Sequence, residues 1–223
     1  MSFYRLSAGL SFLLVASVAS AEWPQWRGPQ RTGYVESGPL LDSLPAEGLQ
    51  PTWSIKPFPG GNSGGWGSPV VSDGKVFVYS HTKNKKGDPG EKKYPWLSPD
   101  KRVGMSDEAY QAYEVKRRAE DERRAKAYSF EQRLLCLDLT TGNVVWDRKN
   151  PATYTRFVQS GTPCVAGGSV YLLGPGRTAM CSDAATGETV WQQTLPGEFR
   201  DEYFASSFVV VDDVALVACG PLI

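Results

Sequence analysis

The chain has 223 residues, of which 24 are Lys or Arg and 24 are Asp or Glu, so its formal net charge is zero. A balanced charge provides no overall field that would recruit nucleic acid or an anionic membrane. The single histidine, His81, argues against a His-rich metal site or a His-based catalytic triad. The four cysteines include no C-x-x-C pair of the kind that holds zinc or haem.

Residues 1–21 have the pattern of a secretory signal peptide. Arg5 supplies a positive charge, residues 6–18 are apolar, and Ala-Ser-Ala at 19–21 is a small-residue cleavage site. The apolar run is shorter than the roughly 20 residues that a membrane span needs. We therefore expect an exported mature chain, 22–223, that is periplasmic or extracellular and has no transmembrane segment. No cysteine follows the run, so a lipid anchor is not indicated.

Three segments of the mature chain have the pattern of β-hairpins. They span 67–79, 161–173 and 206–218, and each places two turn residues between apolar runs: Asp-Gly, Gly-Gly and Asp-Asp, respectively. Gly and Asp tolerate the positive φ angles of a two-residue hairpin turn. After each of the first two hairpins, another pair of strand-like runs flanks a Thr-Gly dipeptide. These patterns predict short antiparallel strands.

The Thr-Gly hairpins carry a signature that returns after 45 residues. The signature consists of an Asp, a Gly and a Trp at matched positions: Asp138, Gly142 and Trp146, then Asp183, Gly187 and Trp191. A period of about 40–45 residues fits a four-stranded propeller blade. We assign Asp and Gly to the turn and Trp to the space between blades. Cys136 and Cys181 also lie 45 apart, and we expect all four cysteines to act as small buried hydrophobes.

At these residues the chain resembles the PQQ-like (pyrroloquinoline-quinone-type) β-propeller repeat family. That family's blade carries Ala-x-Asp-x-x-Thr-Gly-x-x-x-Trp, and residues 136–146 and 181–191 match it with Cys at the Ala position. The mature start, Trp-Pro-Gln-Trp-Arg-Gly-Pro at 23–29, is similar to the opening of exported bacterial propellers of this family. The resemblance covers roughly 22–82 and 130–223 and implies an all-β fold, a β-propeller of four-stranded antiparallel blades.

The resemblance also implies that the propeller is incomplete. Trp53 looks like the Trp of a preceding blade, and the last hairpin begins a further one. We therefore expect two complete blades and pieces of two others, whereas closed propellers have about 4–8 blades. Either the chain is truncated or other chains complete the ring, and the sequence leaves both open.

A charged insertion, 82–129, interrupts the first blade. Residues 83–93 are charged and rich in turn formers, which predicts a flexible loop. Ser106 then has the character of an N-cap for a helix over 107–127. Tyr110, Tyr113 and Val115 would give this helix only a thin apolar stripe, so we expect it to be mostly solvated. The insertion is interpreted either as a docking arm for a partner or an acidic surface polymer, or as a plain solvated connection.

Quinoprotein dehydrogenases of the resembling family hold a quinone over calcium and typically use an adjacent Cys-Cys disulfide, which this chain lacks. Turn roles explain Asp138 and Asp183, so we predict no catalytic residue, no metal ligand and no cofactor. PQQ and calcium enter only under the alternative that the chain is the N-terminal fragment of a PQQ-dependent alcohol dehydrogenase. Exposed aromatics leave a carbohydrate-binding propeller as a third possibility.

The favoured interpretation is a non-catalytic, exported scaffold for protein or ligand binding at the cell envelope. The best-known non-enzymatic relative is the propeller lipoprotein of the outer-membrane assembly machinery. This chain differs from it in the missing lipid-anchor cysteine and in the 82–129 insertion. We expect a protein partner, possibly bound through that insertion, and no nucleic acid.

Overall fold

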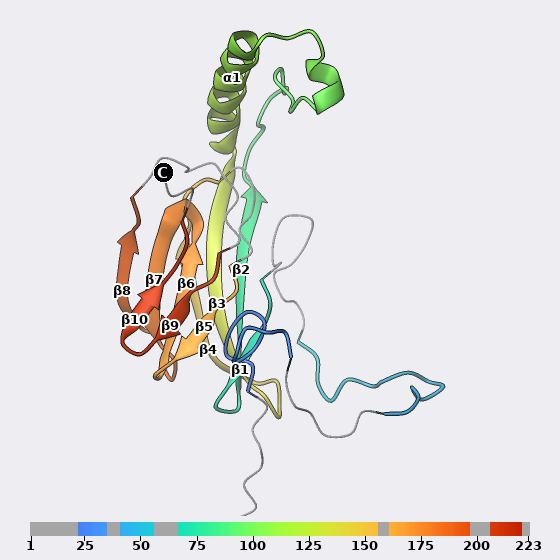
Figure 1. Cartoon of the computed structure of the whole chain (residues 1–223), viewed down its shortest axis with the longest axis vertical. Coiled ribbons are helices and arrows are strands. Elements are labelled where there is room, and N and C mark those ends of the chain that lie inside the picture. The colour runs from blue at the N-terminus through green and yellow to red at the C-terminus, as the bar shows by residue number, and fades with distance from the viewer. Residues whose placement is uncertain (1–21, 35–40, 56–66, 156–160, 197–205, 220–223) are drawn as a thin grey trace, which may run out of the picture.

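The computed structural model describes residues 22–34, 41–55, 67–155, 161–196 and 206–219. The expected signal peptide, 1–21, lies outside the described residues. The described part is mostly β and contains two four-stranded antiparallel sheets, one two-stranded sheet and one α-helix. Figure 1 shows the sheets side by side, with the helix standing beyond one end of them.

The first sheet is blade one, and its strands follow chain order. They are β1 (Val70–Ser72), β2 (Lys75–Lys85), β3 (Tyr128–Asp138) and β4 (Val144–Pro151). The β1–β2 turn is Asp73-Gly74 with both φ angles positive, as the sequence predicts for a two-residue hairpin. A register shift between Cys136 and Leu137 accompanies the pairing of β3 with β4.

The second sheet is blade two and repeats this plan. It contains β5 (Cys164–Ala166), β6 (Ser169–Gly174), β7 (Thr178–Asp183) and β8 (Thr189–Thr194), with the short 3₁₀ helix η2 (Pro175–Arg177) between β6 and β7. Its register shift falls between Cys181 and Ser182, 45 positions after the shift in blade one. A third hairpin, β9 (Val209–Val211) with β10 (Val214–Leu216), begins a further blade. The expected propeller-type architecture is confirmed for the described residues.

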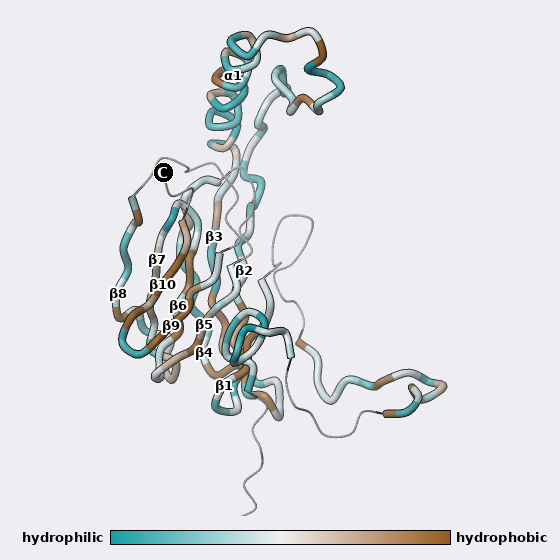
Figure 2. Tube along the Cα trace, in the orientation of Figure 1, coloured by the Kyte–Doolittle hydropathy of each residue, from teal (hydrophilic) through white to brown (hydrophobic). Residues whose placement is uncertain are grey.

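The main core lies between blades one and two. Alternate residues of the strands point to the same face, so one face of each sheet is apolar and packs against its neighbour. Blade one supplies Phe77, Leu134 and Trp146, and blade two supplies Val170 and Leu172. Figure 2 shows the same division, with apolar residues along the strands and hydrophilic ones along the helix.

The insertion rises from blade one between β2 and β3. Both strands have 11 residues and pair without interruption up to Lys85 and Tyr128. They therefore extend further than the expected insertion bounds of 82–129, and residues 83–85, expected in a flexible loop, belong to β2. The insertion proper, residues 86–127, is called the arm below. It contains the 3₁₀ helix η1 (Pro99–Arg102) and the helix α1 (Asp107–Ala125).

Helix α1 begins where the sequence predicts. Ser106 is its N-cap, and the Ser106 hydroxyl accepts a hydrogen bond from the backbone N–H of Ala109 at 3.2 Å. Asp107 and Glu108 occupy the first turn, where negative charge favours the helix dipole. The helix ends at Ala125, two residues before the predicted end.

Candidate functional site

The two Thr-Gly turns have the same geometry. Asp138 accepts hydrogen bonds from the backbone N–H groups of Thr140 (3.1 Å) and Thr141 (2.8 Å) and from the Thr141 hydroxyl (2.8 Å). Asp183 accepts the equivalent three bonds at 2.8 to 3.0 Å. These bonds, first among them those from the threonine hydroxyl at Asp138 and the threonine backbone at Asp183, lower the pKa of both carboxyl groups. Both aspartates thus serve the turns.

Each turn receives a tryptophan from the preceding part of the chain. The Trp53 indole N–H donates to the carbonyl of Leu139 at 2.8 Å, and a Cβ placed on Gly142 would lie 2.5 Å from the Trp53 ring. Gly142 has a φ of 70°, so the turn needs glycine both for its conformation and for this close approach. Trp53 therefore docks on blade one, as a tryptophan of a preceding blade would.

The second tryptophan joins blade one to blade two in the same way. The Trp146 indole N–H donates to the carbonyl of Ala184 at 3.1 Å, and a Cβ on Gly187 would lie 2.6 Å from its ring. Trp191, the third of the series, is 39% exposed, and the centre of its ring lies 6.3 Å from that of the Tyr171 ring. Among the described residues it meets no Thr-Gly turn. Trp53 and Trp146 therefore each dock on the Thr-Gly turn of the blade that follows them in the chain.

The N-terminal residues 22–34, called the clasp below, connect three sheets. Trp23 exchanges two backbone hydrogen bonds with Val71 of β1, at 2.8 and 2.9 Å. The carbonyl of Pro24 accepts from the backbone N–H of Val165 in β5 at 2.8 Å. The Arg31 guanidinium donates to the carbonyl of Phe208, next to β9. The motif at 23–29 resembles the opening of exported bacterial propellers, but nothing in the sequence indicated these contacts.

The arm is held together by charged groups. Arg117 of α1 is buried and donates to both carboxylate oxygens of Glu114, while its other nitrogen lies 3.1 Å from Asp121. Glu120 is buried as well, and its carboxylate accepts the backbone N–H groups of Lys93 (2.9 Å) and Tyr94 (2.7 Å). Burial raises the pKa of Glu120, but these hydrogen bonds and the nearby arginines outweigh it and leave the pKa below its usual value.

Aromatic side chains complete the contact between α1 and the preceding residues of the arm. Tyr94 and Tyr113 pack edge to face with ring centroids 5.6 Å apart, and the Tyr113 hydroxyl donates to the carbonyl of Pro95 at 2.7 Å. The Arg102 guanidinium lies 4.6 Å from the Tyr110 ring. Val115 is 67% exposed. Two members of the expected stripe, Tyr110 and Tyr113, thus lie in the polar and aromatic contact face of α1, whereas Val115 does not.

Comparison with known proteins identifies the repeats. Residues 120–218 match a family model described as outer membrane protein assembly factor BamB. The match spans both Thr-Gly turns and the tryptophans Trp146 and Trp191, but not Trp53. Residues 120–218, less than half of the chain, are therefore similar to PQQ-like propeller repeats. The clasp and most of the arm lie outside the matched residues of this propeller repeat protein.

Two solved structures share short regions with the propeller repeat protein. BamB from Moraxella catarrhalis is 18% identical, with a TM-score of 0.27 over 39% of this chain and 24% of that chain. The quinohemoprotein alcohol dehydrogenase ADHIIG from Pseudomonas putida HK5 is 19% identical, with a TM-score of 0.36 over 68% of this chain and 21% of that chain. This chain thus spans less than a quarter of the length of either structure. No curated protein matches the sequence.

The described part of the propeller repeat protein contains no group of three or more His, Cys, Asp or Glu side chains placed to hold a metal ion. His81 is buried beside Phe130, and burial lowers its pKa to about 4, so the imidazole is neutral at pH 7.

The four cysteines are free thiols; three are buried and Cys219 is partly exposed. Burial raises the pKa of Cys136 to about 11, which suppresses its reactivity. No helix in the described part is long and apolar enough to cross a membrane.

Two of the cavities in the described part of the chain are candidate binding sites. One, of about 250 Å³, lies between the blades and is lined by residues that include Tyr79, Gln132 and Leu172. The Tyr79 hydroxyl and Gln132 Oε1 are buried there without a hydrogen-bond partner among the described residues, which suits ordered water. The other cavity, of about 440 Å³, lies beneath α1. Sequence analysis missed both, because their linings combine residues from distant strands.

Proposed function

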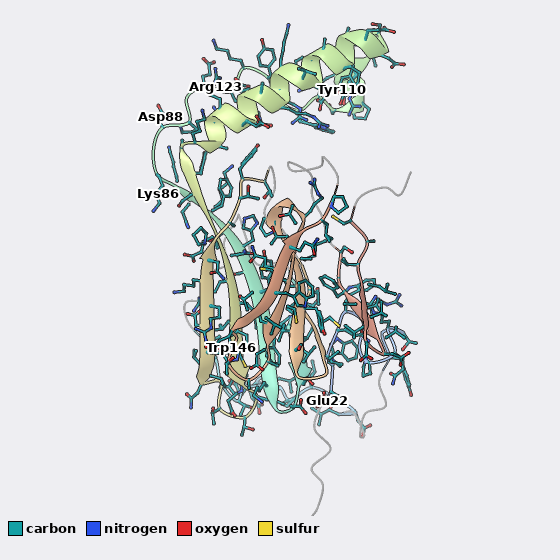
Figure 3. The ribbon with its side chains drawn as sticks, turned by 90° about the vertical axis from the view of Figure 1, so that its left-hand side faces the viewer. Glu22, Lys86, Asp88, Tyr110, Arg123 and Trp146 are labelled. Carbon is teal, nitrogen blue, oxygen red and sulfur yellow. The ribbon has the colours of Figure 1, made fainter. Side chains whose placement is uncertain are left out.

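We propose that this propeller repeat protein is a non-catalytic binding scaffold of the cell envelope, and that the arm (86–127) is its protein-binding element. The observation that carries the proposal is the way blade one presents the arm. Two uninterrupted 11-residue strands lift α1 beyond the end of the sheet, and Figures 1 and 3 show the helix beyond the upper ends of the strands.

The internal bonding of the arm supports a binding role. A plain solvated connection would need no buried arginine, yet Arg117 is enclosed by Glu114 and Asp121, and Glu120 anchors the backbone of the opposite segment. These bonds give the arm a defined shape, which reduces the entropy lost when a partner binds. Exposed Val115 and the basic residues beside it would then be available for contact.

Two further observations support the scaffold part of the proposal. The repeated aspartates are committed to turns and are therefore poor candidates for catalysis. The matching family is described as an outer membrane protein assembly factor, which supports the envelope as the location and a protein as the partner.

The test is an arm-deletion variant in which an Asn-Gly turn replaces 86–127. Lys85 and Tyr128 are directly paired, so a two-residue turn can close this hairpin without disturbing either strand. We expect the variant to keep its β circular dichroism but to lose envelope proteins that the full chain captures from its source cells. A milder variant, Val115→Asp with Lys116→Glu, should weaken the same capture.

Undiminished capture by the deletion variant would refute the arm as the binding element. Thermal unfolding with added PQQ and Ca²⁺ tests the scaffold assignment separately, since a ligand that binds only the folded state must raise the melting temperature. A clear rise would instead support the quinone-dependent alternative.

A further inference from the structure

The cavity beneath α1 is formed by three separate parts of the chain. The ends of β2 and β3 supply Lys83 and Tyr128, the C-terminal half of α1 supplies Asp121, Arg124 and Ala125, and loops supply Lys92, Trp96 and Tyr154. Figure 3 shows α1 lying across the upper ends of the strands, with side chains from both elements extending into the space between. The cavity has a volume of about 440 Å³, which falls within the range of small-molecule sites, about 300–1,000 Å³.

The charges that line the cavity are unbalanced. Three cationic side chains, Lys83, Lys92 and Arg124, face one carboxylate, Asp121. That carboxylate is already engaged, because one oxygen lies 3.0 Å from the Lys92 ammonium and the other lies 3.1 Å from Arg117. Positive charge is therefore left over in the cavity.

Lys83 carries much of this uncompensated charge. Its ammonium lies 4.2 Å from the centre of the Tyr128 ring and 5.9 Å from that of Phe130, and it forms no ion pair with any residue the structure describes. Arg124 likewise donates only to the carbonyls of Pro89 and Gly90 within that part of the chain. Desolvation lowers the pKa of Lys83, with Lys92 and Arg124 acting in the same direction and Asp121 against it. An anion bound in the cavity would compensate the positive charge of Lys83 and Arg124.

Aromatic rings lie beside the cations. Trp96 is 53% exposed although it lines the cavity, and Tyr128 and Tyr154 line it too. An exposed indole at the edge of a polar cavity offers a flat apolar surface, and the neighbouring charged groups offer hydrogen bonds. A ligand that uses both must combine an apolar face with a polar, anionic edge.

We propose that this cavity binds an acidic sugar unit, with its carboxylate or sulfate on Lys83 and Arg124 and the C–H face of its ring on Trp96. The Asp121 carboxylate would accept a sugar hydroxyl. A purely aromatic acid fits less well, because it could not donate to Asp121. The site faces the blades and not the exposed side of α1, so the proposal does not depend on the arm's binding a protein.

The experiment measures binding of small probes to the full mature chain by NMR and calorimetry. Methyl glucuronide and glucose 6-sulfate test the two sources of negative charge, methyl glucoside lacks the charge, and benzoate lacks the hydroxyls. We expect one or both acidic sugars to bind with a Kd of about 1 mM or tighter, to shift the Trp96 indole signal, and to bind better than either control compound.

Lys83→Gln should weaken the acidic sugar about tenfold or more, since it removes a charge-assisted hydrogen bond. Lys116→Gln is the matched control, because Lys116 is exposed on α1 and does not line the cavity. Trp96→Ala, at an exposed position, provides a second variant if Lys83→Gln lowers the melting temperature, and it should also weaken binding.

Three results would overturn the proposal. These are no binding of either acidic sugar at about 10 mM, equal binding of methyl glucoside, and acidic-sugar affinity unchanged in both Lys83→Gln and Trp96→Ala. The relative affinity for glucuronide and sugar sulfate then identifies which anionic group the cavity prefers.

Discussion

The contact between Trp146 and Gly187 can be tested by adding a single methyl group. In Gly187→Ala the new Cβ would lie 2.6 Å from the Trp146 ring, closer than atoms can pack. Gly168→Ala is a matched control in the same blade, because Gly168 has the same φ of 73° but nothing lies within 4 Å of its Cβ position. The pair of variants therefore separates the ring contact from backbone strain.

Both variants place alanine in the left-handed region, which costs about 1–2 kcal/mol. Gly187→Ala must also displace a tryptophan that is 8% exposed, and overpacking of this kind adds about 1–3 kcal/mol. We therefore expect Gly187→Ala to be less stable than Gly168→Ala by about 1–3 kcal/mol. If the indole were expelled altogether, the loss would approach that of a Trp→Ala change, about 3–5 kcal/mol.

Urea unfolding followed by circular dichroism measures the difference, provided the slope is the same for both variants. A larger effect of Gly187→Ala on tryptophan fluorescence should accompany it. Equal stability of the two variants, within about 0.5 kcal/mol, would show that docking of Trp146 on the turn does not stabilise the pair of blades.

Three more outcomes follow from the contacts described. Ser106→Ala should destabilise α1 by about 1 kcal/mol, seen as faster proteolysis of the arm, whereas Ser98→Ala should not, because Ser98 makes no capping hydrogen bond. Hydrogen bonds hold the pKa of Asp183 below its usual 3.8, so its stabilising effect is complete above that pH and is lost as the pH falls through the lower pKa of the folded state. Asp183→Asn should therefore flatten the fall of the melting temperature at acid pH. Ellman's reagent should modify the partly exposed Cys219 first and the other three thiols only on unfolding, so rapid modification of all four would contradict their burial.

The blades could be predicted from sequence because their information is local and repeated. Asp138 and Asp183 form the same turn 45 residues apart, and each fixes the position of the glycine that receives a tryptophan. Even the register shifts after Cys136 and Cys181 repeat at that spacing. A repeat of this kind needs only nearest-neighbour packing, which a short pattern encodes.

The contacts of the arm and its cavity could not be predicted in this way, because they depend on residues that are distant in sequence. Residues 83–85 are polar, so no apolar alternation shows that they continue β2. The contact face of α1 depends on a buried charge, Arg117, and charged residues in a helix are ordinarily exposed. The cavity joins Lys83 to Trp96 and Arg124, and a sequence pattern does not show that such distant residues meet.

The clasp has a consequence for the order of folding. Its contacts join residues 22–34 to β1, then to β5, and finally to Phe208, which is 177 positions from Arg31. Each blade can form from local hairpins, but this last contact must wait until the chain has been made almost to residue 208. Contacts so distant in sequence slow folding. The clasp precedes both blades in the chain and yet is among the last parts to reach its final place, so refolding should show a late phase that reports on the clasp after the sheets have formed.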